Sequence, residues 1–236
     1  MHIDVWFDIL CPFCHLGRRH LALALERFEH RADVTVTGHS YQLDRGAPAV
    51  VEGATIDRIA AKYGVPRAQM VAQHEQMAAD AAAVGLDFQW ATLVSGNSFD
   101  AHRLLHYARS VGREEEVTEI VMRAWYSQGA SLGERSVLID LAVGAGLDQA
   151  AVARMLESDD FGREVREDEA IAAEIGINSV PTFVFDRKYA VVGAQPVEAL
   201  VATLEQVWAD RETAPTERAA STCGGDGGCA GCSCDG

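Results

Sequence analysis

A Cys-Pro-Phe-Cys sequence at residues 11–14 constrains the fold of this chain more than any other feature. It follows residues 2–8, where apolar and polar residues alternate as in a strand with one buried face. Residues 12–30 then carry apolar side chains at helical spacing. Pro12 suits the first turn of a helix, because its missing N–H would have no partner there. The two cysteines are therefore predicted to lie where a first strand passes into a helix.

Cysteines in this position have a direct redox mechanism. Cys11 would precede the helix, where backbone N–H groups lack partners and the helix dipole is positive, and both features favour a thiolate. Cys14 would lie one turn later, close enough to form a disulfide with Cys11. We expect Cys11 to be the nucleophile that forms a mixed disulfide and Cys14 to resolve it. The alternative is half of a zinc site, which would need a second cysteine pair.

The rest of the sequence predicts two further groups of strands and helices. Residues 34–37 are rich in β-branched side chains and suit a second strand, and residues 46–53 read as a loop. Residues 182–185 and 189–192 read as a late β-hairpin, which a helix from Pro196 follows. The helices expected between these groups span about residues 66–84, 98–111, 113–127, 135–144, 148–157 and 162–175.

This order predicts an α/β protein built as β-α-β, a large all-helical insertion, and β-β-α, with one four-stranded sheet. Residues 1–53 and 176–212 would form the sheet domain, and residues 54–175 the helical insertion domain. Residues 213–236, rich in cysteine and glycine, are expected to be a disordered tail, because no large apolar residue follows Trp208.

Three segments carry a resemblance to a known family. Asp-Ile-Leu-Cys-Pro-Phe-Cys at residues 8–14, Asn-Ser-Phe-Asp-Ala-His-Arg at 97–103 and Val-Pro-Thr-Phe-Val-Phe at 180–185 resemble the DsbA-like branch of the thioredoxin superfamily. Within that branch they are similar to the FrnE-type cytoplasmic thiol–disulfide oxidoreductases. The resemblance covers about residues 2–210 and implies a thioredoxin-like fold.

The resemblance also implies how substrate is bound. It implies a cis peptide bond between Val180 and Pro181 that faces the cysteines, with the Val180 backbone free to pair with an extended substrate segment. Pro12 and Phe13 would contact substrate beside it. The alternative is a proline that merely begins an edge strand.

One residue departs from the periplasmic DsbA pattern. Those proteins carry histidine where this chain has Phe13, and phenylalanine cannot donate a hydrogen bond to a thiolate. We therefore expect a reduction potential that is either similar to that of thioredoxin or intermediate between thioredoxin and DsbA. We do not expect the strongly oxidising potential of DsbA itself.

Two other sets of polar residues allow a functional or a structural interpretation. Asn97 and His102 either lie near the active-site cleft, or Asn97 caps a helix that carries His102 and Arg103 on its surface. His39, on the second predicted strand, is expected to be a structural residue with satisfied hydrogen bonds rather than a catalyst.

The tail has four of the six cysteines, and the sequence leaves their role open. Thiolates with flexible glycine-rich spacing could bind zinc or copper(I), could exchange with Cys11 as a tethered redox shuttle, or could have no specific role. The cysteines are Cys223, Cys229, Cys232 and Cys234.

Charge and composition exclude several classes of binding partner. The formal net charge of −15 opposes binding to nucleic acids and to anionic membranes. No apolar run approaches the roughly 20 residues of a membrane span, and no signal peptide is evident, so we expect a cytoplasmic protein. No nucleotide-binding pattern occurs, and no cofactor is expected to be required. The sequence does not indicate an oligomeric state.

The predicted function is exchange of disulfides with thiols and disulfides of proteins or of small molecules, glutathione among them. One alternative is a glutathione-dependent isomerase or transferase of the kappa-class type, although serine usually stands there at the position of Cys11. A second alternative is a metal-binding protein that acts through its cysteine tail.

Overall fold

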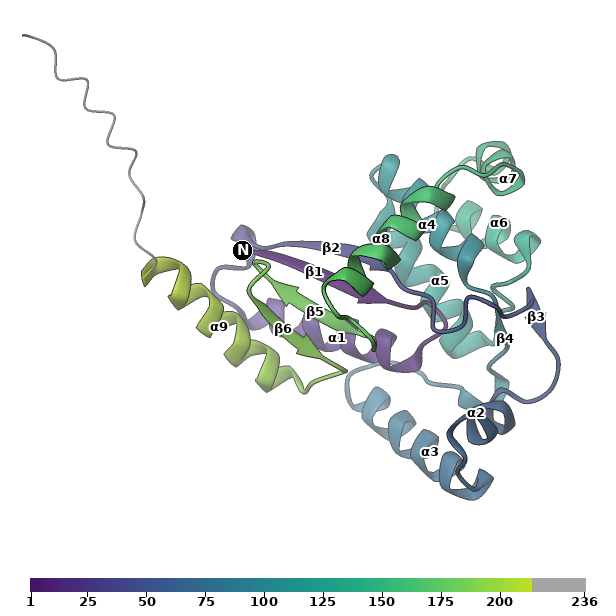
Figure 1. Cartoon of the computed structure of the whole chain (residues 1–236), viewed down its shortest axis with the longest axis horizontal. Coiled ribbons are helices and arrows are strands. Elements are labelled where there is room, and N and C mark those ends of the chain that lie inside the picture. The colour runs from purple at the N-terminus through teal and green to yellow at the C-terminus, as the bar shows by residue number, and fades with distance from the viewer. Residues whose placement is uncertain (214–236) are drawn as a thin grey trace, which may run out of the picture.

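The computed structural model describes residues 1–213, which contain a four-stranded sheet and a helical insertion beside it (Figure 1). The strands are β1 (His2–Phe7), β2 (Thr35–Ser40), β5 (Thr182–Phe185) and β6 (Tyr189–Val192), in the spatial order β2-β1-β5-β6. β2 runs parallel to β1, β5 antiparallel to β1, and β6 antiparallel to β5. The late hairpin therefore joins the opening β-α-β unit edge to edge, which confirms the predicted fold class.

Side chains on β1 alternate between the two faces of the sheet. Phe7 faces α1 (Pro12–Arg27), where the Arg18 guanidinium lies 4.9 Å from its ring centre. α1 packs beside α9 (Val197–Thr213). Trp6 faces the other way and donates from Nε1 to the Asp168 carbonyl of α8 (Gly162–Glu174). The period of two along β1 thus places helices on both faces of the sheet.

The insertion packs onto the sheet domain through one continuous hydrophobic core. Residues of β1, α1, α4, α5 and α9 all belong to this core, so the inserted helices share buried surface with the strands. The helices of the insertion that precede α8 are α2 (Thr55–Tyr63), α3 (Arg67–Ala83), α4 (Phe99–Ser110), α5 (Glu114–Gln128), α6 (Arg135–Gly144) and α7 (Gln149–Glu157).

Small elements differ from the sequence prediction. The expected loop at residues 46–53 contains β3 (Val50–Val51), which pairs with β4 (Ser95–Gly96) inside the insertion. α1 ends at Arg27 rather than at residue 30, because Phe28 takes an extended conformation. Two-residue strands depend on a partner distant in sequence, so no local pattern reveals them. Short 3₁₀ helices occur at Arg31–Asp33 and Trp90–Thr92.

Within residues 1–213, no helix has both the length and the apolar character needed to cross a bilayer. The predicted tail, including its four cysteines, lies outside the described residues, apart from its first residue, Thr213, which ends α9.

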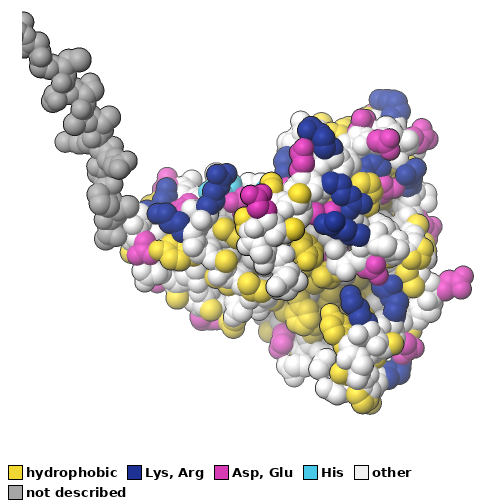
Figure 2. Space-filling view, in the orientation of Figure 1, with side chains coloured by type: hydrophobic (Ala, Val, Ile, Leu, Met, Phe, Trp, Pro, Cys, Tyr) yellow, Lys and Arg dark blue, Asp and Glu magenta, His cyan; other side chains and the backbone are white. Residues whose placement is uncertain are grey.

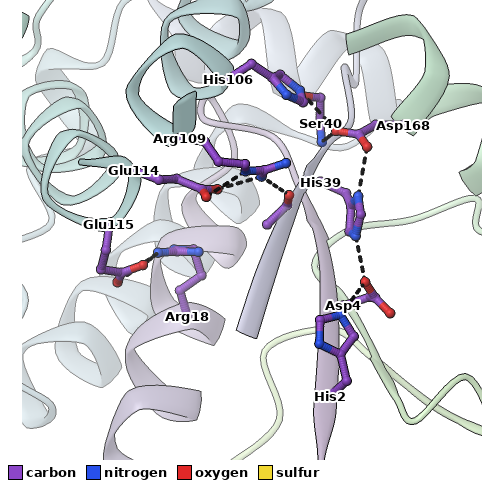
Figure 3. Close-up of polar contacts among 11 residues, drawn as sticks. His2, Asp4, Arg18, His39, Ser40, His106, Arg109, Glu114, Glu115 and Asp168 are labelled. Carbon is purple, nitrogen blue, oxygen red and sulfur yellow. Dashed lines mark hydrogen bonds and ion pairs between the residues drawn. The ribbon is translucent and has the colours of Figure 1, made fainter. Parts of the chain in front are cut away.

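A chain of imidazoles and carboxylates fastens α8 to the sheet (Figure 3). His39 on β2 lies between two carboxylates, with Nε2 2.7 Å from Asp4 Oδ1 and Nδ1 2.8 Å from Asp168 Oδ1. Asp168 Oδ2 accepts from the Ser40 backbone N–H and lies 3.1 Å from His106 Nε2. Since both ring nitrogens of His39 face acceptors, both carry protons. This arrangement confirms that the hydrogen bonds of His39 are satisfied, as expected of a structural residue.

These contacts between imidazoles and carboxylates shift the pKa of the two central groups, His39 and Asp168. Burial opposes the charge of His39, but hydrogen bonds to Asp168 and Asp4 outweigh it and raise the His39 pKa. Burial likewise opposes the charge of Asp168, but hydrogen bonds from His106 and His39 hold the Asp168 pKa far below its usual value. Next to these residues, Arg109 donates to the Gly38 carbonyl and to the Glu114 carboxylate. Figure 3 shows the pair of Arg109 and Glu114.

These shifts predict a pH-dependent contribution to stability. His39→Gln should lower the free energy of unfolding by about 3 kcal/mol at pH 6, because Asp4 and Asp168 lose the cation between them. The contribution of His39 to the free energy of unfolding is fully present below about pH 6.5. It is lost as the pH rises through the raised His39 pKa of the folded state. The Asp168 contribution is full above about pH 3.9 and is lost as the pH falls through the lowered pKa.

Urea unfolding across pH 4–9 measures this dependence. The difference between wild type and His39→Gln should be largest at about pH 4–6.5 and should shrink at alkaline pH. His2→Gln is the matched control, since His2 contacts Asp4 at the exposed end of the same chain and should have a smaller effect. Equal losses at pH 6 and pH 9 for His39→Gln would contradict the account.

Candidate active site

The two cysteines lie at the start of α1, as predicted. Cys11 is the N-cap residue, Pro12 occupies the first turn, and the Cys14 backbone N–H donates to the Cys11 carbonyl at 3.0 Å. Both thiols are free, and Cys11 is 4% exposed whereas Cys14 is fully buried. Cys11 lines a surface groove, and Cys14 is not among the described residues that line it. Of the two cysteines, Cys11 is therefore the one that borders the groove.

Cys14 is held as a thiol by its surroundings. Burial raises the pKa of Cys14 well above its ordinary value, and the neighbouring Cys11 raises it further. A smaller opposing effect comes from the Asp8 backbone N–H, which favours the Cys14 thiolate by hydrogen bonding. A buried thiol of this kind is a weak nucleophile until its proton is removed.

The second predicted part of the site comes from the opposite end of the chain. The Val180–Pro181 peptide bond is cis, as the resemblance implied. The Cys11 Sγ lies 3.9 Å from the Val180 carbonyl oxygen. Gly17 of α1 allows this approach, since a Cβ atom there would lie 2.8 Å from Cγ of Pro181. Two segments almost 170 residues apart in sequence thus meet at one sulfur atom.

A large groove opens beside Cys11, between the start of α1 and helices α2 and α3. Its volume of about 1780 Å³ exceeds the roughly 300–1,000 Å³ of typical small-molecule sites. Pro12 and Phe13 line it next to Cys11, and the Phe13 side chain is 51% exposed. Ile59 and Tyr63 line its far part. Figure 2 shows hydrophobic side chains gathered on the hollowed surface near α2 and α3.

Asp8 lies at the base of the groove and was not singled out from the sequence. Its carboxylate is 2% exposed and accepts from the backbone N–H groups of Leu10 at 3.1 Å and Leu43 at 2.8 Å. His102 Nε2 lies 3.5 Å from Asp8 Oδ1. Burial opposes the charge of Asp8, but His102 and the two backbone donors lower the Asp8 pKa overall. The sequence feature that could have drawn attention to Asp8 is its position, three residues before the first cysteine of the motif.

The segment at residues 97–103 has a mixed role. Asn97 lies one residue before Ser98, the N-cap of α4, and its side chain accepts from the Phe99 backbone N–H at 2.9 Å and donates to the Ala47 carbonyl at 2.8 Å. The alternative that placed His102 and Arg103 on the helix surface is wrong, because they are 1% and 2% exposed. Neither Asn97 nor His102 is among the described residues that line the groove, and His102 lies behind Asp8.

Arg103 fastens the insertion internally. Its guanidinium donates to the carbonyl oxygens of Met155, Ser158 and Asp160 and pairs with Asp100 at 2.6 Å. A metal site built on three or more histidine, cysteine or acidic side chains does not occur within the part of the chain that the structure describes. The predicted metal ligands Cys223, Cys229, Cys232 and Cys234 lie outside that part.

Comparison with known proteins agrees with this geometry. The family model of the DSBA-like thioredoxin domain matches residues 2–205. A crystal structure of a probable DsbA oxidoreductase from Streptomyces coelicolor is 38% identical, covers 89% of this chain and 91% of its own, and superposes with a TM-score of 0.86. The uncharacterized protein YwbO of Bacillus subtilis is 27% identical over 188 residues, which are 78% of this chain and 86% of YwbO.

More distant structures share the fold alone. The cytosolic disulfide reductase DsbM from Pseudomonas aeruginosa is 16% identical, with a TM-score of 0.61 over 89% of this chain and 99% of its own. A 2-hydroxychromene-2-carboxylate isomerase is also 16% identical, with a TM-score of 0.69 over 90% of this chain and 98% of its own.

The contact between α1 and the cis-proline segment predicts the effect of one substitution. Gly17→Ala should lower the free energy of unfolding by about 1–3 kcal/mol, because the new methyl group forces Pro181 away from α1. Gly144→Ala at the end of α6 is the matched control, since its new Cβ meets nothing within 4 Å, and it should change stability by less than about 0.5 kcal/mol. Urea unfolding of both variants measures the difference, and equal effects would contradict close packing at Gly17.

Proposed function

Because the chain belongs to the DsbA-like thioredoxin family, we propose that it is a thiol–disulfide oxidoreductase with Cys11 and Cys14 as its redox pair. The observation that carries this proposal is the placement of Cys11. Its sulfur lies at the N-terminus of α1, beside the carbonyl that precedes a cis proline, and its partner Cys14 is buried behind it.

The chemistry follows from the unequal positions of the two thiols. Cys11 attacks one sulfur of a substrate disulfide, the substrate S–S bond breaks, and the departing sulfur leaves with the bonding electron pair. Cys14 then attacks the Cys11 sulfur, forms the Cys11–Cys14 disulfide and releases the second substrate thiolate. Two electrons pass to the substrate, and the reverse sequence oxidises a dithiol.

Substrate binding is assigned to the residues around Cys11. The Val180 backbone would pair with an extended substrate segment, and Pro12 and Phe13 would contact the groups that flank the reacting sulfur. The groove has room for a polypeptide segment as well as for a small thiol. Glutathione is the small thiol we propose, and a DsbM structure with GSH, which shares this fold, supports that choice.

Three finer points stand as proposals. The FrnE-type subfamily rests on the sequence motifs. A cytoplasmic location is supported by the cytosolic DsbM, which has the same fold. Metal binding by Cys223, Cys229, Cys232 and Cys234 rests on their spacing.

A second candidate function is isomerisation with a glutathione-type thiol. It is favoured by the fold shared with 2-hydroxychromene-2-carboxylate isomerase. A pair of cysteines at the start of α1 favours disulfide exchange instead, since an isomerase of the kappa-class type needs no resolving thiol.

A turnover assay tests the proposed function. Wild type should accelerate the reduction of insulin by dithiothreitol, and Cys11→Ser should abolish this acceleration because no mixed disulfide can form. Cys14→Ser should instead accumulate a mixed disulfide on Cys11, visible by mass spectrometry. A variant with serine in place of the four tail cysteines is the control, and it should retain turnover. Activity that survives in Cys11→Ser would refute the proposal.

The reduction potential tests the role given to Phe13. Equilibration with glutathione buffers should give a value of about −270 to −180 mV for wild type. Phe13→His should make the pair more oxidising, because an imidazole can stabilise the Cys11 thiolate of the reduced form, whereas Phe13→Leu should leave the potential unchanged. A wild-type value near about −120 mV, as in DsbA, would overturn this interpretation.

A further inference from the structure

The wall of the groove follows one face of α1 well beyond the cysteine motif. The α1 side chains that line it recur at helical spacing, and they include Leu16, Arg19, Leu23 and Arg27. Cys11 borders the groove at the start of this face. A substrate that is bonded to Cys11 and extends along this wall therefore passes Leu16 and then meets Arg19.

Arg19 is a cation without an acidic partner. Its Nε–H donates to the carbonyl of Val84, the residue that ends α3, at 2.9 Å. By contrast, Arg27 pairs with Glu198 at 3.2 Å, and Arg58 of α2 lies 3.9 Å from Asp44. Within residues 1–213 no ion pair includes Arg19. A guanidinium has five N–H donors, so the half-buried Arg19 side chain is held in place with donors left for a ligand in the groove.

The other charged groups of the groove do not neutralise Arg19. Asp8 at the base accepts from two backbone N–H groups, and the exposed Asp80 of α3 accepts from Gln76 at 2.9 Å. Lys62 of α2 adds a second cation to the lining. Figure 2 shows basic side chains close to the hydrophobic surface near α2 and α3. This wall thus favours an anionic ligand, although the whole chain has a formal net charge of −15.

The distance from Cys11 to Arg19 fits a short substrate segment. Arg19 follows Cys11 by eight residues, which corresponds to a rise of about 12 Å along α1. Helical side chains lean toward the N-terminus of their helix, which brings the guanidinium closer to Cys11 than its own Cα atom. An extended chain covers roughly 3.3–3.6 Å per residue, so a carboxylate two or three residues from the reacting cysteine reaches this region.

We propose that Arg19 binds a carboxylate that flanks the reacting disulfide, and that it thereby selects anionic disulfides over neutral ones. This inference rests on the proposed function and names a specificity-determining residue for it. Glutathione carries a carboxylate on each side of its cysteine, and an acidic residue near a cysteine supplies one in a polypeptide. The planar guanidinium donates two parallel hydrogen bonds to a carboxylate, which gives the contact its geometry.

Stopped-flow rate constants for the reaction of the reduced protein with two disulfides measure this selection. One disulfide is glutathione disulfide, and the other is the neutral bis(2-hydroxyethyl) disulfide. Arg19→Gln should lower the rate constant for glutathione disulfide about tenfold and leave that for the neutral disulfide unchanged, because a charge-assisted hydrogen bond is lost. Arg19→Lys should retain part of the preference, since it keeps the charge without the paired donors.

The matched control is Arg18→Gln. Arg18 is the neighbouring arginine of α1, it pairs with Glu115 at 3.0 Å, and it does not line the groove. This variant should react with both disulfides at the wild-type rates.

Two further comparisons identify the source of the carboxylate. The first compares glutathione disulfide with its fully esterified form, and the second compares two peptide disulfides that carry aspartate or asparagine two residues from the cysteine. A loss of rate on esterification that is absent in Arg19→Gln assigns the carboxylate to glutathione. A preference for the aspartate peptide that is absent in Arg19→Gln assigns it to a polypeptide.

Two results would overturn the role of Arg19. One is a wild type that distinguishes neither glutathione disulfide from its ester nor the two peptides. The other is an equal slowing of both the anionic and the neutral disulfide by Arg19→Gln, which indicates a structural role.

Failure of wild type to react with any of these disulfides would instead overturn the proposed function. Calorimetric binding of S-methylglutathione and of the S-methylated aspartate peptide, neither of which can exchange, then tests Arg19 separately. Arg19→Gln should weaken the binding of at least one of them about tenfold. Unchanged affinity for both would overturn the carboxylate contact.

Discussion

The close packing of α1 against the cis-proline segment determines where the reactive sulfur can lie. Gly17 leaves room for Pro181, which brings the Val180 carbonyl beside Cys11 at the first turn of the helix. Cys14, one turn further along α1, is fully buried. The contact between α1 and the cis-proline segment thus joins distant parts of the sequence at Cys11, the cysteine that we propose reacts first.

The helical insertion contributes to the site as well as covering the sheet. Asn97 fixes the loop after β2, whose Leu43 N–H holds the Asp8 carboxylate. His102 approaches the same carboxylate from α4. On the other side of β1 and β2, the His39 chain fastens α8 to the sheet (Figure 3). Two sets of polar contacts therefore join the insertion to the sheet. One set lies at Asp8, close to the cysteine motif, and the other lies at His39.

Much of the architecture could be predicted from local sequence. The cysteine motif, the alternation along β1 and the late hairpin are short-range patterns, and they placed Cys11 at the start of α1 correctly. The cis Val180–Pro181 bond followed from the family resemblance and not from a local pattern. The burial of His102 and Arg103 could not be predicted, because helical spacing does not say which neighbour a polar face will meet. Asp8 was missed for the same reason: its importance depends on Leu43 and His102, both far from it in sequence.

Selective alkylation tests most directly whether Cys11 is the reactive thiol and Cys14 the protected one. Reduced protein would be treated with a limiting amount of iodoacetamide at pH 7, and each cysteine would be quantified by peptide mapping. The structure predicts label on Cys11 and almost none on Cys14, because Cys14 is fully buried and its pKa is raised by burial and by Cys11. Labelling of Cys14 at the rate of Cys11, or ahead of it, would contradict the account.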